Sequence, residues 1–121
     1  MKASRKLQNL RNSQQFRRVY EQGQRFHTPF FSAFIRKNDS SEQRFGITVT
    51  RKIGCAVIRN RCKRRLREVM RACQLEGLNS TGFDLVVNVK SGLAEADYKQ
   101  LQEAFSRVIG RFRDSLVKQS S

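Results

Sequence analysis

The hydrophobic positions of the chain recur with two different periods, and each period predicts one type of element. In residues 44–50 the apolar side chains stand at every second position, which predicts a strand with one apolar face. Residues 30–37, which precede a cluster of turn-forming residues, predict a second strand that pairs with the first as a hairpin. Residues 83–90 predict a third strand.

Three other segments, residues 13–22, 57–73 and 97–117, have the apolar spacing of amphipathic helices. Asn12 and Gln15 have the spacing of a capping box. The apolar stripe of the middle helix comprises Ile58, Cys62, Leu66, Val69 and Cys73. The last helix is expected to bury Tyr98, Leu101, Phe105, Val108, Ile109, Phe112 and Leu116. The order helix, strands, helix, strand, helix predicts a small α+β fold, an α/β sandwich.

The length of 121 residues suits a single domain, with residues 1–11 and 118–121 expected to be loose tails because they are polar and basic. An apolar run of about 18 residues, the length that indicates a membrane span, is absent. A secretory hydrophobic segment is absent as well, so we expect a cytoplasmic location and no membrane partner.

The net charge of the chain is its most informative property about a binding partner. Lys and Arg number 25 against 10 Asp and Glu, which gives a formal net charge of +15. A field of this size repels itself unless a polyanion neutralises it. Nucleic acid is the natural polyanion, because binding its phosphates releases condensed counterions.

The candidate chemistry of the polypeptide itself is sparse. Cys55, Cys62 and Cys73 form no CxxC pair, and His27 is the only histidine, so neither a zinc site nor a disulfide framework is expected. The thiols are expected to be reduced and partly buried. The acidic residues are scattered, without the cluster that a metal-dependent nuclease needs. We therefore predict no catalytic residues, no bound metal and no activity for the isolated polypeptide.

Positive charge is concentrated in residues 51–71, where Glu68 is the only acid. A solvated helix face usually mixes charges four residues apart, because like charges at that spacing repel. Here Lys63–Arg67 and Arg67–Arg71 are both like-charged pairs. The apolar stripe is expected to hold this helix to the core while its opposite side binds a polyanion.

The segment RKIGCAVIRNRCKRRLR at 51–67 resembles the signature of the bacterial ribonuclease P protein component, which centres on an Arg-Asn-Arg triplet. Residues 16–20 with Gly23, and residues 45–49, resemble the first helix and the preceding strand of that family. The resemblance covers nearly the whole chain. It implies a single RNA-binding domain that resembles a ribosomal-protein-like sandwich, with a left-handed crossover through the basic helix.

The resemblance also implies a division of labour. An RNA subunit removes the 5′ leader of precursor tRNA with Mg²⁺ at the RNA active site, and the protein assists without requiring a protein partner. By position, the residues that contact the RNA subunit would be Arg59, Asn60, Arg61, Lys63, Arg64 and Arg67. The leader-binding cleft would comprise Phe16, Tyr20, Phe31 (or Ala33 nearby), Arg51, Lys52 and Lys90.

The residues themselves leave two interpretations of the aromatic pair Phe16 and Tyr20. One helical turn apart, they are either core residues or a platform on which unpaired bases stack. The small and polar side chains that alternate with the apolar ones in residues 46–50 and 88–90 favour the platform, because they leave one side of the sheet without bulky apolar cover.

Two other functions compete with a ribonuclease P subunit. A non-catalytic ribosomal or RNA-assembly protein has the same size and charge, and it would bind RNA without affecting precursor-tRNA cleavage. A DNA-binding regulator would use residues 57–73 as a recognition helix. A helix-turn-helix normally places another helix just before it, whereas here a strand precedes the segment.

Overall fold

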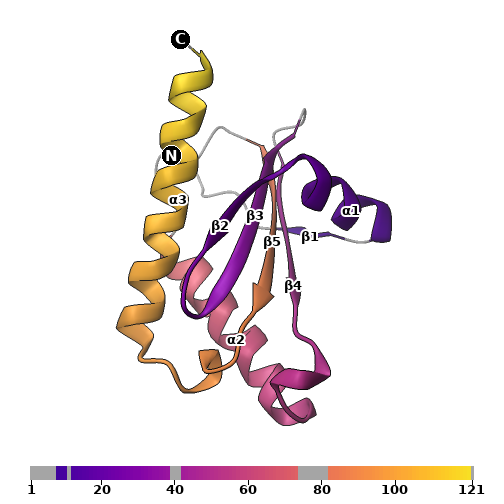
Figure 1. The fold of residues 1–121 in the computed structure, drawn as a ribbon, viewed down its shortest axis with the longest axis vertical. Helices are drawn as coiled ribbons and strands as arrows, with labels where there is room; N and C mark the ends of the chain where they lie inside the picture. The colour runs from indigo at the N-terminus through magenta and orange to yellow at the C-terminus, as the bar shows by residue number, and fades with distance from the viewer. Residues whose placement is uncertain (1–7, 11, 39–41, 74–81, 121) are drawn as a thin grey trace.

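The computed structural model describes residues 8–10, 12–38, 42–73 and 82–120, with the backbone alone at residues 8, 9, 73 and 117–120. The elements in chain order are β1 (Gln8–Asn9), α1 (Ser13–Gln22), β2 (Gln24–His27), β3 (Phe31–Lys37), β4 (Gln43–Thr48), the 3₁₀ turn η1 (Arg51–Ile53), α2 (Ala56–Cys73), β5 (Phe83–Val89), the 3₁₀ turn η2 (Leu93–Glu95) and α3 (Tyr98–Ser120). This order confirms the predicted α+β class (Figure 1).

The described strands form one mixed sheet in the order β1-β4-β5-β3-β2. Strand β5 lies at its centre, antiparallel to β3 and parallel to β4. Its side chains are buried on both faces, since Leu85 and Val87 join one apolar cluster, while Val86 joins another and Asp84 beside it is 2% exposed. A strand that is buried on both faces belongs in the interior of a sheet, which explains why β5 separates its two neighbours.

The predicted hairpin between the strands at 30–37 and 44–50 is therefore wrong, because β5 lies between β3 and β4. The hairpin that does form joins β3 to β2, which the sequence interpretation missed. Its turn is held by the Thr28 hydroxyl, which accepts hydrogen bonds from the backbone N–H groups of Phe30 and Phe31. Strand β2 was missed because Phe26 is its only apolar residue.

Described residues within both predicted tails belong to regular elements, and the rest of each tail lies outside the described residues. Gln8 and Asn9 pair in parallel with β4, and the side chain of Leu10 is buried. At the other end, α3 continues through Ser120. A short polar strand carries no periodic signal of its own, so only its pairing with β4 reveals it.

The helices lie on opposite faces of the sheet, α1 on one side and α3 on the other (Figure 1). The larger buried cluster includes Leu66 of α2, Phe105 of α3 and Leu85 of β5, so α2 and α3 share one face. On the other face α1 contributes Val19 to a smaller cluster. The sheet is therefore covered fully on one side and partly on the other.

Helix α2 connects the parallel neighbours β4 and β5, as the resemblance implies for the basic helix. Parallel strands need such a crossover, because a tight turn can join only antiparallel strands. The left-handed sense of the crossover stays a prediction.

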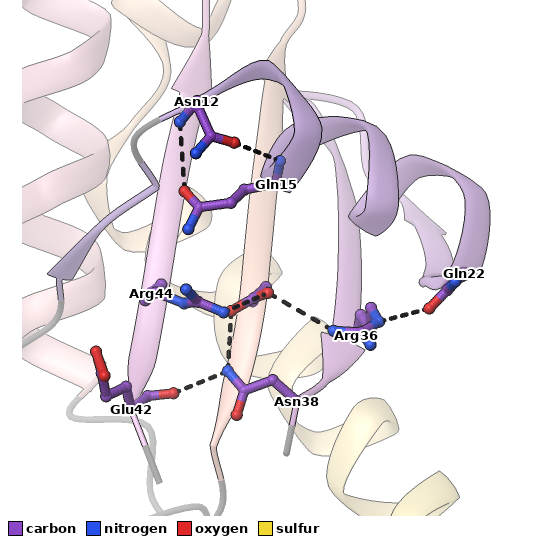
Figure 2. Close-up of polar contacts among 8 residues, drawn as sticks. Asn12, Gln15, Gln22, Arg36, Asn38, Glu42 and Arg44 are labelled. Atoms are coloured by element: carbon purple, nitrogen blue, oxygen red, sulfur yellow. Dashed lines mark hydrogen bonds and ion pairs between the residues drawn. The ribbon is translucent and has the colours of Figure 1, made fainter. Parts of the chain in front are cut away.

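A polar cluster beneath the C-terminal end of α1 ties the strands together (Figure 2). Asp84 of β5, 2% exposed, accepts two hydrogen bonds from Arg44 of β4, at 2.9 and 3.1 Å. Arg36 of β3 lies 3.8 Å from the same carboxylate and donates to the side chain of Gln22, the last residue of α1. At the other end of α1, Asn12 and Gln15 form the predicted capping box. Both ends of α1 are thus held by polar side chains.

Candidate nucleic-acid interface

Helix α2 is anchored by the predicted apolar stripe. Cys62, Leu66 and Val69 have no exposed surface, and Ile58 packs against the same core. Met70, which the prediction left out, is also buried. The side chain of Cys73, the last member of the predicted stripe, lies outside the described residues.

The opposite side of α2 is cationic and open to solvent. Asn60, Arg61, Arg64, Arg67 and Arg71 are exposed, and Lys63 is half-buried. Among the described residues, no ion pair involves a cation of this helix. The residues expected to contact an RNA subunit therefore lie together on a surface that described carboxylates leave unneutralised.

Two arginines of α2 have structural hydrogen bonds. Arg65 donates to the carbonyl oxygens of Leu93, Ala94 and Ala96, and thus joins the helix to the η2 turn. Arg59, half-buried, donates to the carbonyl of Gly54 at 2.9 Å, just before the helix begins. Charge alone could not separate these two residues from their exposed neighbours, because the separation depends on tertiary contacts.

The two described cysteines differ in environment, and both are free. Cys62 is buried in the core, as expected, and burial raises the pKa of its thiol above the ordinary value. Cys55 is exposed before the start of α2, where hydrogen bonds with the backbone of Ile58 and then Val57 lower the pKa of its thiol.

The aromatic pair of α1 divides between the two interpretations. Phe16 is half-buried and packs against the smaller cluster of Leu10, Val19 and Val86. Tyr20 is 38% exposed, and its ring meets that of Phe34 edge-on at 4.9 Å between centroids. Phe16 therefore serves the core in part, while Tyr20 presents an aromatic ring at the surface.

The hydroxyl of Tyr20 donates a hydrogen bond to Oδ1 of Asn88, at 2.9 Å. Asn88 lies on β5, two residues from Val86, and thus on the sheet face that α1 covers. Beyond the pair, Arg25 of β2 lies over the Phe34 ring, 5.5 Å from its centroid. The sequence interpretation identified neither the Tyr20–Asn88 hydrogen bond nor the Arg25–Phe34 contact.

The expectation that Phe31 lines the leader-binding cleft is wrong. Its side chain has no exposed surface and packs in the main core, 6.2 Å from the Phe105 ring, on the face away from α1. Ala33 is buried in the same core. Strand alternation puts Ser32 and Phe34 on the α1 face instead, and a one-residue error in assigning register moves a side chain to the other face.

The remaining cations of the expected cleft lie at the ends of the central strands. Arg51 and Lys52 are exposed on η1, which begins three residues after the end of β4. Lys90, half-buried after β5, donates from Nζ to the carbonyl of Thr28 at 2.7 Å, so it supports the β2–β3 turn. Arg51 and Lys52 thus remain open to a ligand, while Lys90 already has a partner within the protein.

A search of the described residues finds no group of three or more His, Cys, Asp or Glu side chains that could hold a metal ion. Within the same residues, no helix is long and apolar enough to cross a membrane.

Comparisons with known proteins agree on one family. The family model for ribonuclease P matches residues 4–113. A ribonuclease P protein component of Lachnoclostridium phytofermentans is 33% identical over 97 residues, covering 80% of this chain and 82% of that protein. The corresponding protein of Caldanaerobacter subterraneus is 36% identical over 107 residues, covering 86% and 88%.

Two solved structures resemble the fold. The ribonuclease P protein of Thermotoga maritima has a TM-score of 0.72 and 31% identity, over 86% of this chain and 96% of that one. The Staphylococcus aureus protein has a TM-score of 0.73 over 87% and 94%, and at 24% identity it supports the fold alone.

Proposed function

Because the chain belongs to the ribonuclease P protein family, we propose that it binds the catalytic RNA subunit through α2 and the 5′ leader of precursor tRNA through the Tyr20 side of the sheet. As a family member it is a protein component of a ribonucleoprotein endonuclease, and association with ribonuclease P RNA follows from that membership. The two proposed surfaces divide the binding of subunit and substrate between them.

The observation that carries the RNA-subunit proposal is the outer side of α2. Arg61, Arg64 and Arg67 are exposed, while the opposite stripe of the helix is buried. Phosphates are the natural ligands for such a row, since each guanidinium presents a planar fork of donors. Asn60 and Lys63 belong to the same surface. Arg59 extends this surface at the N-terminal end and also donates a hydrogen bond to the carbonyl of Gly54.

The leader proposal is supported by Tyr20, whose exposed ring offers a stacking surface beside polar strand residues. Phe16, one helical turn away and half-buried against the smaller cluster, belongs to the same proposed surface. Arg51 and Lys52 supply exposed charge for the leader backbone. Lys90 contributes positive charge near the same strand ends. Phe31 is not part of this proposal.

The proposal extends to the catalytic division of labour between RNA and protein. We propose that Mg²⁺ is held mainly by RNA and substrate, and that the cations of the protein reduce repulsion between two polyanions. Residues 1–121 would act as a single RNA-binding domain in the cytoplasm, without a required protein partner.

Reconstitution tests this function. The protein is added to a bacterial ribonuclease P RNA, and leader removal from precursor tRNA is followed across a magnesium titration. Cleavage should extend to lower magnesium concentrations when the protein is present. Binding to the RNA without any effect on cleavage at any magnesium concentration would instead support a ribosomal or assembly role.

A matched pair of variants locates the RNA surface. Replacing Arg61, Lys63 and Arg67 by Ala should weaken binding to the RNA subunit. The control variant replaces three exposed cations of α3 by Ala, namely Lys99, Arg107 and Arg111. Both variants lose the same charge, so equal weakening would contradict a specific role for α2.

A further inference from the structure

Helix α1 lies across three neighbouring strands, along one row of residues that are paired in register. We call this row the seat of α1, and it comprises Gly46 of β4, Val86 of β5 and Phe34 of β3. Phe16 packs against the first of them, Val19 shares a buried cluster with the second, and the Tyr20 ring meets the third edge-on. Apolar contacts hold the helix on the sheet but have little directional preference. The rotation of α1 about its own axis is therefore set mainly by directional contacts on either side of the seat.

The residues on the two sides of the seat are polar. On one side, two positions away along each strand, lie Arg44, Asp84 and Arg36, which are also paired in register. This charged row alternates in sign across the sheet, and both arginines lie within ion-pair distance of the buried Asp84. On the other side, Asn88 stands two positions beyond Val86 on β5. Helix α1 thus lies between the charged row and Asn88.

Hydrogen bonds tie α1 to the sheet on both flanks. Oε1 of Gln22 accepts a hydrogen bond from Nε of Arg36 at 2.8 Å (Figure 2), and the hydroxyl of Tyr20 is bonded to Oδ1 of Asn88 at 2.9 Å. Successive residues of an α-helix are about 100° apart around its axis, so Gln22 and Tyr20 project from opposite flanks of α1. The two bonds together therefore oppose rotation of the helix in either direction.

Arg36 is a well-anchored partner for Gln22. Its Nη1 lies 3.8 Å from Oδ2 of Asp84, and that carboxylate accepts two hydrogen bonds from Arg44. A guanidinium can contact a carboxylate and an amide oxygen at once, because its donors point in several fixed directions. Arg36 thus connects the central strand of the sheet to the last residue of α1.

Building on the proposed leader binding, we propose that Arg36 and Gln22 are positioning residues for the leader. They act through Tyr20, which lies two residues before Gln22 on the same helix. Their bond holds α1 at the rotation that presents the Tyr20 ring, so the binding surface is formed before the leader arrives. Without this bond, leader binding would have to order α1 as well, and the leader would bind more weakly.

The test uses the reconstituted holoenzyme and two precursor tRNAs that differ only in leader length, one long and one minimal. KM and kcat are measured for both substrates, and the leader effect is the ratio of their kcat/KM values. The test variants are Gln22→Ala, which removes the acceptor, and Arg36→Lys, which keeps the charge but loses the guanidinium fork. The double variant combines them.

Two controls separate positioning from other effects. Gln14→Ala makes the same replacement at another exposed position of α1. Arg65→Lys breaks the contacts of α2 with the η2 turn, so it lowers stability without touching α1. Both controls should retain the wild-type leader effect.

Gln22→Ala and Arg36→Lys should each reduce the leader effect by about fivefold, the change expected from the loss of one net hydrogen bond. The reduction should appear as a higher KM for the long-leader substrate, with its kcat and both constants of the minimal-leader substrate unchanged. The double variant should lose no more than either single variant, because both replacements remove the same bond. A general loss of structure would instead lower activity on both substrates alike.

The possible failures are distinguishable. If the wild type shows a leader effect that either test variant retains in full, or that either control loses equally, the positioning inference is overturned while leader binding stands. A fall confined to kcat, or shared by the minimal-leader substrate, overturns it as well. If the wild type processes both substrates with equal kcat/KM, leader binding is overturned and this inference falls with it.

Discussion

The ring of Phe16 lies so close to Gly46 that a Cβ atom added to Gly46 would be 2.4 Å from Cζ of the ring. Real Cβ atoms do not approach this closely, so the Phe16 ring of α1 occupies the space that a side chain at position 46 would need. The close fit of this ring against β4 therefore depends on glycine at position 46.

Replacing Gly46 by Ala should therefore lower the free energy of unfolding by about 1–3 kcal/mol, the usual cost of overpacking. Urea denaturation measures the change. Gly110→Ala is the control, because its added Cβ has only the Arg113 side chain within 4 Å, at 3.8 Å, and Ala is favoured over Gly inside a helix. Equal stability of the two variants would show that Phe16 moves aside freely.

Asp84 joins three strands, since Arg44 and Arg36 bind it from either side. Replacing Asp84 by Ala leaves these cations without their carboxylate and should lower the free energy of unfolding by about 3 kcal/mol. The exposed Asp114→Ala should change it by less than about 0.5 kcal/mol. A similar small change for both, in thermal or urea denaturation, would mean that solvent already screens the Asp84 cluster.

Arg65 and Arg61 are four residues apart on one helix, but their replacement should affect the stability of the protein to different extents. Arg65→Lys removes a guanidinium that bridges the carbonyls of Leu93, Ala94 and Ala96, so stability should fall by about 1–2 kcal/mol. Arg61→Lys should leave stability within about 0.5 kcal/mol, because Arg61 is exposed. Differential scanning calorimetry compares the two, and a larger loss for Arg61→Lys would contradict this assignment.

The thiols should differ in reactivity. The lowered pKa of Cys55 increases its thiolate fraction at pH 7–8, and thiolate is the form that reacts with iodoacetamide. Cys62 is buried and its pKa is raised, so it should react only after unfolding. Peptide mass spectrometry after alkylation of the native protein resolves the two sites. Equal modification of both would contradict the burial of Cys62.

Much of the fold could be predicted from the sequence, because the helices carry strong local signals. The capping box of Asn12 and Gln15 and the apolar stripe of α2 depend on residues close in the chain. Strand pairing, in contrast, does not depend on residues that are close in the chain. The position of β5 between β3 and β4 depends on residues about 40 to 58 positions apart, and no local pattern encodes that choice.

The candidate site divides in the same way. The exposed cations of α2 were predictable, because the buried stripe dictates which side faces outward. The hydrogen bond between Tyr20 and Asn88 was not, since the two residues are 68 positions apart in the chain. Phe31 was misplaced because an apolar strand residue can face either side, and only the packing of Phe105 against it decides which.

The salt dependence of RNA binding tests the physical cause of the α2 interface. Each phosphate that the protein neutralises releases counterions, so the logarithm of the binding constant falls linearly with the logarithm of salt concentration. Replacing Arg61, Lys63 and Arg67 by Ala should reduce the magnitude of that slope by roughly one unit for each phosphate that the variant no longer binds. The matched α3 variant at Lys99, Arg107 and Arg111 should keep the wild-type slope. Filter binding of the RNA subunit at several salt concentrations supplies both slopes, and a wild-type slope in the α2 variant would mean that these cations do not bind phosphate.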